Sequence, residues 1–267
     1  MTIGSTGTVG GDHPELASGA TWRVHGSGAP VTLVVHGLGA TEGEARIPAS
    51  GLRGTRVVLT LPGHGGAADP ADGYWSYERV ADDVLEAADR VGAERAVGVS
   101  LGAGALTRIA ARNPARFERL VLLLPAALDQ PRGGEVTEVF DRLAAGVAAA
   151  AEDDGEWLRA IVGSGLPDDA DVGHYVEQRA ATLRRLGPAL RTLPRQAPLD
   201  DSAELSAVAS PALVIGAASD PLHDPSVAER LAAVLPEARL EVFDSAAPML
   251  DRRAELRKLL TGFLNDR

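Results

Sequence analysis

A serine between two glycines is the feature of this sequence that points most directly to chemistry. It lies in the pentad Gly-Val-Ser-Leu-Gly at residues 98–102, after an apolar pair at 96–97 and before a helix-forming run at 103–112. G-x-S-x-G between a strand and a helix is the pattern of a nucleophile elbow, a tight turn that holds a serine hydroxyl at the end of a sheet. The glycines let two backbones pass closely beside it. We therefore expect Ser100 to attack a carbonyl carbon, which requires a base to accept its proton.

Attack by a serine leaves negative charge on the carbonyl oxygen, and backbone N–H groups must receive that charge. Leu101 follows Ser100 at the start of the expected helix, where first-turn N–H groups have no partner within the helix. A second donor is expected from the glycine-rich loop His36-Gly37-Leu38-Gly39, which follows a β-branched run. The sequence thus predicts an oxyanion hole made by the N–H groups of Leu38 and Leu101.

Short apolar runs alternate with helix-like segments on both sides of Ser100. Strands are expected at residues 21–25, 31–35, 55–61, 95–99, 117–124, 211–216 and 239–243, and helices at 42–50, 76–91, 103–112, 225–235 and 251–264. This alternation predicts the α/β class, with a mostly parallel central sheet and helices on both faces. Ligands of such sheets bind outside the carboxyl ends of the strands. The loops at 36–40, 62–66, 98–102 and 219–224 all fall at that edge.

The alternation stops between residues 127 and 206. No strand is expected there, and the expected elements are helices at 135–151, 156–162 and 172–186 and a loop at 193–202. We interpret residues 127–206 as a helical cap inserted into an α/β core, which comprises residues 1–126 and 207–267. Substrate choice is expected to depend on this cap.

Composition narrows the classes of partner. The 267 residues include 45% hydrophobic and 24% charged side chains, which is ordinary for a globular protein. A net charge of −11 argues against nucleic acid, whose phosphates need clustered Lys and Arg. There is no cysteine, no leader-like N-terminus and no apolar run long enough to cross a membrane. We expect a cytoplasmic protein with a small-molecule substrate and no membrane contact. No His, Asp or Glu cluster has metal-ligand spacing, so no metal and no cofactor are expected, and the oligomeric state stays open.

These motifs, in this order and at this spacing, resemble the α/β-hydrolase superfamily. The resembling segments are residues 34–39 (Val-Val-His-Gly-Leu-Gly), 61–65 (Leu-Pro-Gly-His-Gly), 98–102, and 213–216 (Leu-Val-Ile-Gly) leading to 219–223 (Ser-Asp-Pro-Leu-His). The resemblance covers residues 20–125 and 208–265 and implies an α/β-hydrolase fold with a variable helical cap. It implies Ser100 as the nucleophile, Asp220 as the acid of a Ser-His-Asp triad, and Leu38 and Leu101 as oxyanion donors. It also implies that His36 and His64 shape their loops by hydrogen bonds.

The chain departs from the family at the third member of the triad. The family's histidine usually follows the last strand, just before the final helix, and the aligned position here is Pro248. Proline has no titratable group, and no histidine follows His223 in the chain. His223, three residues after Asp220 on a loop at the correct edge, is our first choice as a replacement base. His174 in the cap is the second choice. Without such a replacement the triad is incomplete.

Three functions are compatible with this pattern. In the first, Ser100 carries out hydrolysis or acyl transfer on a small ester, thioester, amide or lactone, with a non-standard or missing base. In the second, a lyase, cyclase or isomerase uses the oxyanion hole to hold an enolate and Asp220 to move a proton. In the third, the chain is an inactive relative that binds a ligand or a partner protein. The retained Ser100, Asp220 and oxyanion loops favour an enzyme.

Overall fold

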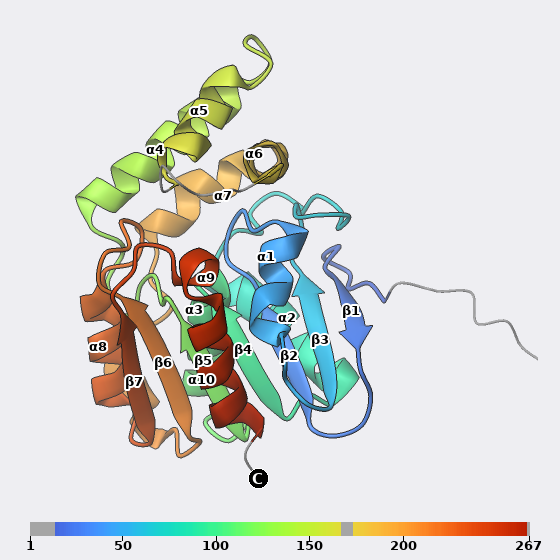
Figure 1. Cartoon of the computed structure of the whole chain (residues 1–267), viewed down its shortest axis with the longest axis vertical. Helices are drawn as coiled ribbons and strands as arrows, with labels where there is room; N and C mark the ends of the chain where they lie inside the picture. The colour runs from blue at the N-terminus through green and yellow to red at the C-terminus, as the bar shows by residue number, and fades with distance from the viewer. Residues whose placement is uncertain (1–13, 167–172, 266–267) are drawn as a thin grey trace, which may run out of the picture.

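Seven strands form one sheet, in the order β1-β3-β2-β4-β5-β6-β7, in the computed structural model, which describes residues 14–166 and 173–265. The strands are β1 (Thr21–His25), β2 (Val31–Val35), β3 (Thr55–Thr60), β4 (Arg95–Val99), β5 (Arg119–Leu123), β6 (Ala212–Ala217) and β7 (Ala238–Phe243). β1 runs antiparallel to β3, and the other neighbouring pairs are parallel. The mostly parallel sheet expected from the sequence is therefore present, and the carboxyl ends of β2 to β7 share one edge (Figure 1).

Helices cover both faces of this sheet (Figure 1). The helices of the core are α1 (Glu42–Arg46), α2 (Tyr77–Val91), α3 (Leu101–Arg112), α8 (Pro225–Val234), α9 (Pro248–Asp251) and α10 (Arg253–Asn265). Successive residues of a strand point to opposite faces. In β2, Leu33 packs in the apolar cluster that includes α2, α3 and α8, whereas Val34 packs in the cluster that includes α1 and α10. Both faces are thus buried, which explains the unbroken apolar runs of the strands.

Four further helices lie between β5 and β6 in the chain, where the sequence predicts a cap. They are α4 (Gly134–Ala149), α5 (Glu156–Ser164), α6 (Tyr175–Leu183) and α7 (Gly187–Thr192), and short 3-10 helices follow at Leu193–Arg195 and Ser202–Ala207. In Figure 1 the four helices stand at the top of the view, beyond the carboxyl ends of the strands. They therefore lie over the edge of the sheet that carries the loops at 36–40, 62–66, 98–102 and 219–224.

Two helical segments differ from the expectation. Residues 187–192 form α7 rather than a break, because Pro188 occupies the first turn, where its missing N–H costs no hydrogen bond. The closing helix expected at 251–264 is α10, and a separate short helix, α9, precedes it and begins at Pro248. The start expected for α6, at Val172, lies outside the described residues. Both differences occur at a proline. A helix tolerates proline in its first turn, but the hydrophobic pattern of the sequence does not show where such a helix begins.

Within the described parts of the chain, no helix combines the length and the apolar character that spanning a bilayer requires. Over the same residues, no three or more His, Cys, Asp or Glu side chains gather in a way that would hold a metal ion.

Candidate active site

Ser100 lies at a sharp turn between β4 and α3. Its backbone has φ 52° and ψ −105°, a conformation that residues with a side chain seldom adopt. Its N–H donates to the carbonyl oxygen of Leu123 at 2.9 Å, which ties the turn to the end of β5. Gly102 passes so close to β2 that a Cβ there would overlap the carbonyl group of Val35. The pentad thus forms the strained strand-to-helix turn of a nucleophile elbow, held in place by the neighbouring backbone.

Ser100, His223 and Asp220 form a continuous chain of hydrogen bonds. The Oγ atom of Ser100 lies 2.8 Å from Nε2 of His223, and Nδ1 of the same ring lies 2.8 Å from Oδ2 of Asp220. An ionised carboxylate can only accept, so Nδ1 carries the ring proton and Nε2 is left to accept the proton of the serine hydroxyl. Only 14% of the His223 side chain and 8% of the Asp220 side chain are exposed. This arrangement has the geometry of a base that can activate a serine.

Asp220 and His223 share the loop between β6 and α8. Oδ1 of Asp220 accepts from the N–H of Leu222 at 2.8 Å, and this Asx turn folds the loop so that the His223 ring meets the other carboxylate oxygen. The loop ends at Asp224, whose side chain caps α8 by accepting from the N–H of Ser226. Local hydrogen bonds therefore fix the positions of the acid and the base relative to each other.

The segment after β7, where the family resemblance places the histidine, contains no histidine. Pro248 begins α9 and is one of the residues that line the cavity around Ser100. The Ser245 hydroxyl in this segment is bound to the carboxylate of Asp251 at 2.7 and 2.9 Å. His174 is exposed at the N-terminus of α6 and is not part of the lining of the cavity. Of the two candidate bases, His223 lies at the serine and His174 does not.

Two buried histidines hold the loops around the elbow. Nε2 of His64 accepts from the N–H of Gly39 at 2.8 Å, and Nε2 of His36 accepts from the N–H of Leu61 at 3.1 Å. Burial lowers the pKa of His36, and burial together with the neighbouring His36 ring brings the pKa of His64 well below its ordinary value. Both rings are therefore neutral, which leaves each Nε2 free to accept a hydrogen bond.

The loop after β2 packs directly against the elbow. A Cβ on Gly37 would lie 3.2 Å from the Cβ of Ser100, so the backbone of this loop touches the serine. Leu38 lines the cavity beside Ser100. Leu101 is the first residue of α3, where N–H groups have no acceptor within the helix. Both residues expected to donate to an oxyanion thus belong to segments that border Ser100.

A cavity of about 200 Å³ opens above Ser100, between the core loops and the helices α4, α6 and α7. Its apolar lining residues include Leu38, Val99, Leu124, Phe140, Leu143, Leu166, Leu183, Leu190, Leu222, Met249 and Leu250. On the polar part of its wall the Tyr175 hydroxyl donates to Glu44 at 3.1 Å, and Arg179 lies 3.4 Å from the same carboxylate. Burial raises the pKa of Tyr175 to about 12, so the hydroxyl keeps its proton. The cavity suits a small, mainly apolar molecule.

Three charged residues of this cavity were not singled out from the sequence: Glu44, Arg132 and Arg179. Glu44 carried a usable signal, because it lies three residues after Thr41 and forms a capping box with it at the start of α1. The two arginines carried none, since each reaches its partner across a large separation in the chain, 135 residues for Arg179 and Glu44.

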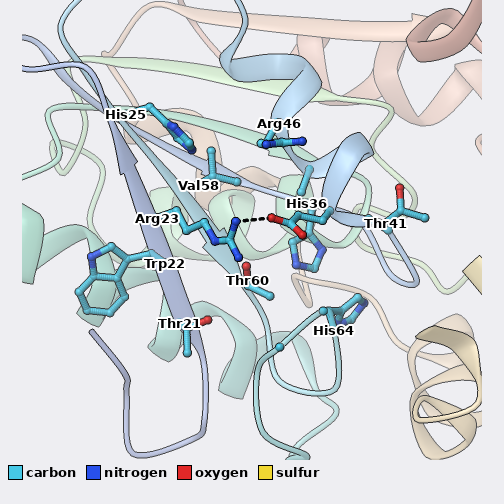
Figure 2. Close-up of a pocket in the computed structure, with 15 residues that line it drawn as sticks. Thr21, Trp22, Arg23, His25, His36, Thr41, Arg46, Val58, Thr60 and His64 are labelled. Carbon is cyan, nitrogen blue, oxygen red and sulfur yellow. Dashed lines mark ion pairs between the residues drawn. The ribbon is translucent and has the colours of Figure 1, made fainter. Parts of the chain in front are cut away.

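A second cavity, of about 250 Å³, is lined in part by the loop at 36–41 (Figure 2). Residues of β1, β3 and α1 line it, and Arg23 extends into it to form an ion pair with Glu42. His36 lines both cavities, so the loop forms the wall between them. Ser100 is absent from the lining of the second cavity, and none of its histidines meets a hydroxyl in the described hydrogen bonds. The cavity at Ser100 is therefore the candidate active site.

Comparison with known proteins identifies the protein family of this chain. A family model described as the alpha/beta hydrolase family matches residues 32–259, from β2 into α10. The match covers most of the chain, and the chain belongs to the α/β-hydrolase family.

Individual relatives of the chain are hydrolases by name. A 2-hydroxymuconate semialdehyde hydrolase of Pseudomonas putida is 34% identical over 116 residues, which are 40% of this chain and 41% of that relative. A hydrolase from Pseudomonas aeruginosa PA01 shares 26% identity and a TM-score of 0.74, over 96% of this chain and 99% of its own. The enol-lactonase of Burkholderia xenovorans LB400 resembles the chain in fold, with 22% identity and a TM-score of 0.71 over 92% of this chain and 96% of its own. The match to the curated relative thus spans less than half of that relative's length.

Proposed function

We propose that the chain is a serine hydrolase in which Ser100 is the nucleophile, His223 the general base and Asp220 the acid. The observation that carries this proposal is the unbroken hydrogen-bonded chain from the Ser100 hydroxyl through His223 to Asp220, with 2.8 Å at each step. A serine hydroxyl needs a base within hydrogen-bond reach, and His223 Nε2 meets that requirement. The base thus comes from the loop after β6 and replaces the histidine that Pro248 cannot supply.

The geometry supports a two-step acyl transfer. His223 Nε2 accepts the hydroxyl proton while Ser100 Oγ bonds to the carbonyl carbon, and the N–H groups of Leu38 and Leu101 receive the oxyanion. The imidazolium then protonates the leaving group, which departs and leaves an acyl-serine. Water, deprotonated by His223, attacks the acyl carbon; the bond to Ser100 Oγ then breaks, the imidazolium returns a proton to Oγ, and the acid is released. Asp220 holds the proton on Nδ1 throughout and stabilises the positive ring.

The cavity favours a small substrate with an apolar acyl group, such as an ester, thioester or lactone. Its volume of about 200 Å³ and its leucine-rich wall support this size and character. Helices α4, α6 and α7 supply one wall, and so residues 127–206 act as a cap over the core of residues 1–126 and 207–267. Differences in this cap would set the choice of substrate.

Labelling with a fluorophosphonate probe tests the proposal. Such a probe forms a covalent bond with an activated serine, and rapid labelling that Ser100→Ala abolishes is the expected result. p-Nitrophenyl acetate and butyrate should be hydrolysed faster than the octanoate, because the cavity is small. Absence of labelling in the folded wild-type protein would reject the activated serine and favour the lyase-like or inactive alternatives.

A second candidate substrate is 2-hydroxymuconate semialdehyde, which the curated relative from Pseudomonas putida is named for. The sequence likeness over 116 residues is the observation that favours it. Chromatographic measurement of its consumption, with Ser100→Ala as the control, compares it with the simple esters. Turnover of esters without consumption of this compound would leave the simple acyl hydrolase as the function.

A further inference from the structure

The loop after β6 carries both the acid and the base, and this creates a positioning problem. Asp220 binds Leu222 and His223 within the same loop. These bonds fix the base relative to the acid, but they cannot fix either of them relative to Ser100, which lies on another element. When acid and base come from two loops, each loop restrains the other. On a single loop that restraint has to come from outside.

Hydrogen bonds from other segments to this loop are few in the part of the chain that the structure describes, although the Leu222 side chain also packs against the main apolar cluster. At its start, the N–H of Ala218 donates to the carbonyl oxygen of Phe243 at the end of β7. Between the acid and the base, Nη1 of Arg132 donates to the carbonyl oxygen of Leu222 at 3.2 Å. Apart from Ser100 itself, Arg132 is the one side chain of another segment that makes a described hydrogen bond to residues 218–224. It reaches the loop one residue before His223.

Arg132 is itself held firmly. Its guanidinium stacks over the ring of Phe140 in α4, 4.7 Å from the ring centroid. Its backbone N–H donates to the carbonyl oxygen of Pro194 at 3.2 Å. Burial lowers the pKa of Arg132, and Tyr77 and then Asp220 act in the opposite direction, so the guanidinium lies within the field of the acid. Its Nε is buried without a hydrogen-bond partner among the described residues.

We infer that Arg132 is a positioning residue for this site: its bond to Leu222 holds the loop after β6 at the distance where His223 meets Ser100. The inference rests on the proposed function of Ser100 and His223. Arg132 acts through the loop and does not touch the reacting atoms. Through Phe140 it also links α4 to the loop after β6.

The test compares Arg132→Met with a matched control, Arg116→Met. Arg116 likewise donates to a carbonyl oxygen (that of Ala93 at 2.8 Å) and stacks on a phenyl ring (that of Phe117 at 4.7 Å); it also pairs with Asp89 at 2.8 Å, and it lies away from the cavity. We expect Arg132→Met to lower kcat and the rate of fluorophosphonate labelling by between about 10-fold and 100-fold, with KM within about twofold of wild type. Arg132→Lys should regain part of the loss, because its ammonium can still donate to the loop. Arg116→Met should leave kcat and KM unchanged.

Two kinetic outcomes would overturn the inference. A rise in KM with kcat unchanged would make Arg132 a substrate contact. Unchanged kinetics in Arg132→Met, with a fall in melting temperature like that of Arg116→Met, would make its role purely structural. A crystal structure of Arg132→Met gives a readout that needs no activity: the His223 Nε2 to Ser100 Oγ distance should lengthen beyond hydrogen-bond reach, and an unchanged distance contradicts the inference. If wild type fails to react, the proposed function fails, whereas a reactive wild type with an equally reactive Arg132→Met removes only the positioning role.

Discussion

The loops that follow β6 and β7 leave neighbouring parallel strands at the same edge of the sheet, yet they bring different chemistry to the cavity. The first brings Asp220 and His223, which are hydrogen-bonded to each other and to Ser100. The second brings Pro248, whose ring can neither accept nor donate a proton. In the family pattern the acid and the base come from these two loops separately. The difference indicates that a triad requires a geometry at the serine, not a fixed place for the histidine in the chain.

The two segments also differ in where their polar groups find hydrogen-bond partners. The segment after β7 satisfies its own polar groups, since Ser245 binds Asp251 and accepts from the N–H of Ala247 at 2.9 Å. The loop after β6 instead directs its polar groups toward Ser100 and receives Arg132 from outside. A segment whose polar groups are hydrogen-bonded to one another can serve as an apolar wall for the substrate.

Removal of the base should have the largest effect. His223→Ala leaves no imidazole at Ser100, and we expect kcat to fall by about 10⁵-fold to 10⁶-fold, as when the base of such a triad is lost. His174→Ala, at the exposed alternative position, should leave kcat unchanged. The rate of ester hydrolysis in the three proteins is the measurement. Substantial activity in His223→Ala would show that the base for Ser100 lies outside the loop after β6.

Loss of the acid should be the next largest effect. Asp220→Asn keeps the size of the side chain but presents an amide where the carboxylate held the Nδ1 proton, so the ring can take the wrong tautomer. We expect kcat to fall by about 10⁴-fold. Asp224→Asn is the control, because Asp224 caps α8 and does not meet His223. Equal losses in both variants would mean that the effect comes from the fold of the loop and not from the charge of Asp220.

The strands, the elbow and the loop that carries Asp220 and His223 can be predicted from the sequence, because each depends on local sequence signals. β-branched runs predict the strands, the glycines of residues 98–102 predict the elbow, and the three-residue spacing of Asp220 and His223 places both at one edge. The hydrogen bond between His223 and Ser100 cannot be predicted from the sequence in this way. It depends on an Asx turn at Asp220 and on Arg132, which lies 90 residues from the carbonyl that it binds. Contacts of that range leave no periodic or spacing signal in a single sequence.

Transfer of the base between the two loops should have an intermediate effect. In the background His223→Ala, adding Pro248→His puts an imidazole into the segment that lines the cavity at the family's usual position. We expect the double variant to recover about 100-fold of the lost rate, a typical contribution of a general base. Pro248→His alone should change the wild-type rate by less than about threefold, since His223 already serves Ser100.

The control for this transfer is Pro248→Ala in the same His223→Ala background, which removes the ring without adding a base. Recovery by this control would indicate that the proline itself restrains the site. If neither double variant recovers, an imidazole in the segment after β7 does not reach Ser100, and this segment serves only as a wall of the cavity.

The smallest predicted effect concerns the loops around the elbow that carries Ser100. Their structure does not depend on which loop supplies the base. His36 and His64 hold these loops, and burial lowers the pKa of both in the folded protein. Well above pH 6.5 each ring is neutral in both states and the stability does not depend on its titration. Below pH 6.5 the unfolded chain binds protons that the folded chain does not, so the free energy of unfolding falls as the pH falls. The slope is up to about 1.4 kcal/mol per pH unit for each ring.

Urea unfolding between pH 7.5 and 5 measures this slope. His64→Gln removes one titrating ring, while its amide oxygen can still accept from the N–H of Gly39. We expect the variant to be less stable than wild type at pH 7.5, because glutamine fills the site less well, but to lose less stability on acidification. His174→Gln, at an exposed position, should keep the wild-type slope. If His64→Gln also keeps it, protonation of His64 does not oppose folding, and the loop at 36–41 takes its stability from contacts other than a neutral His64.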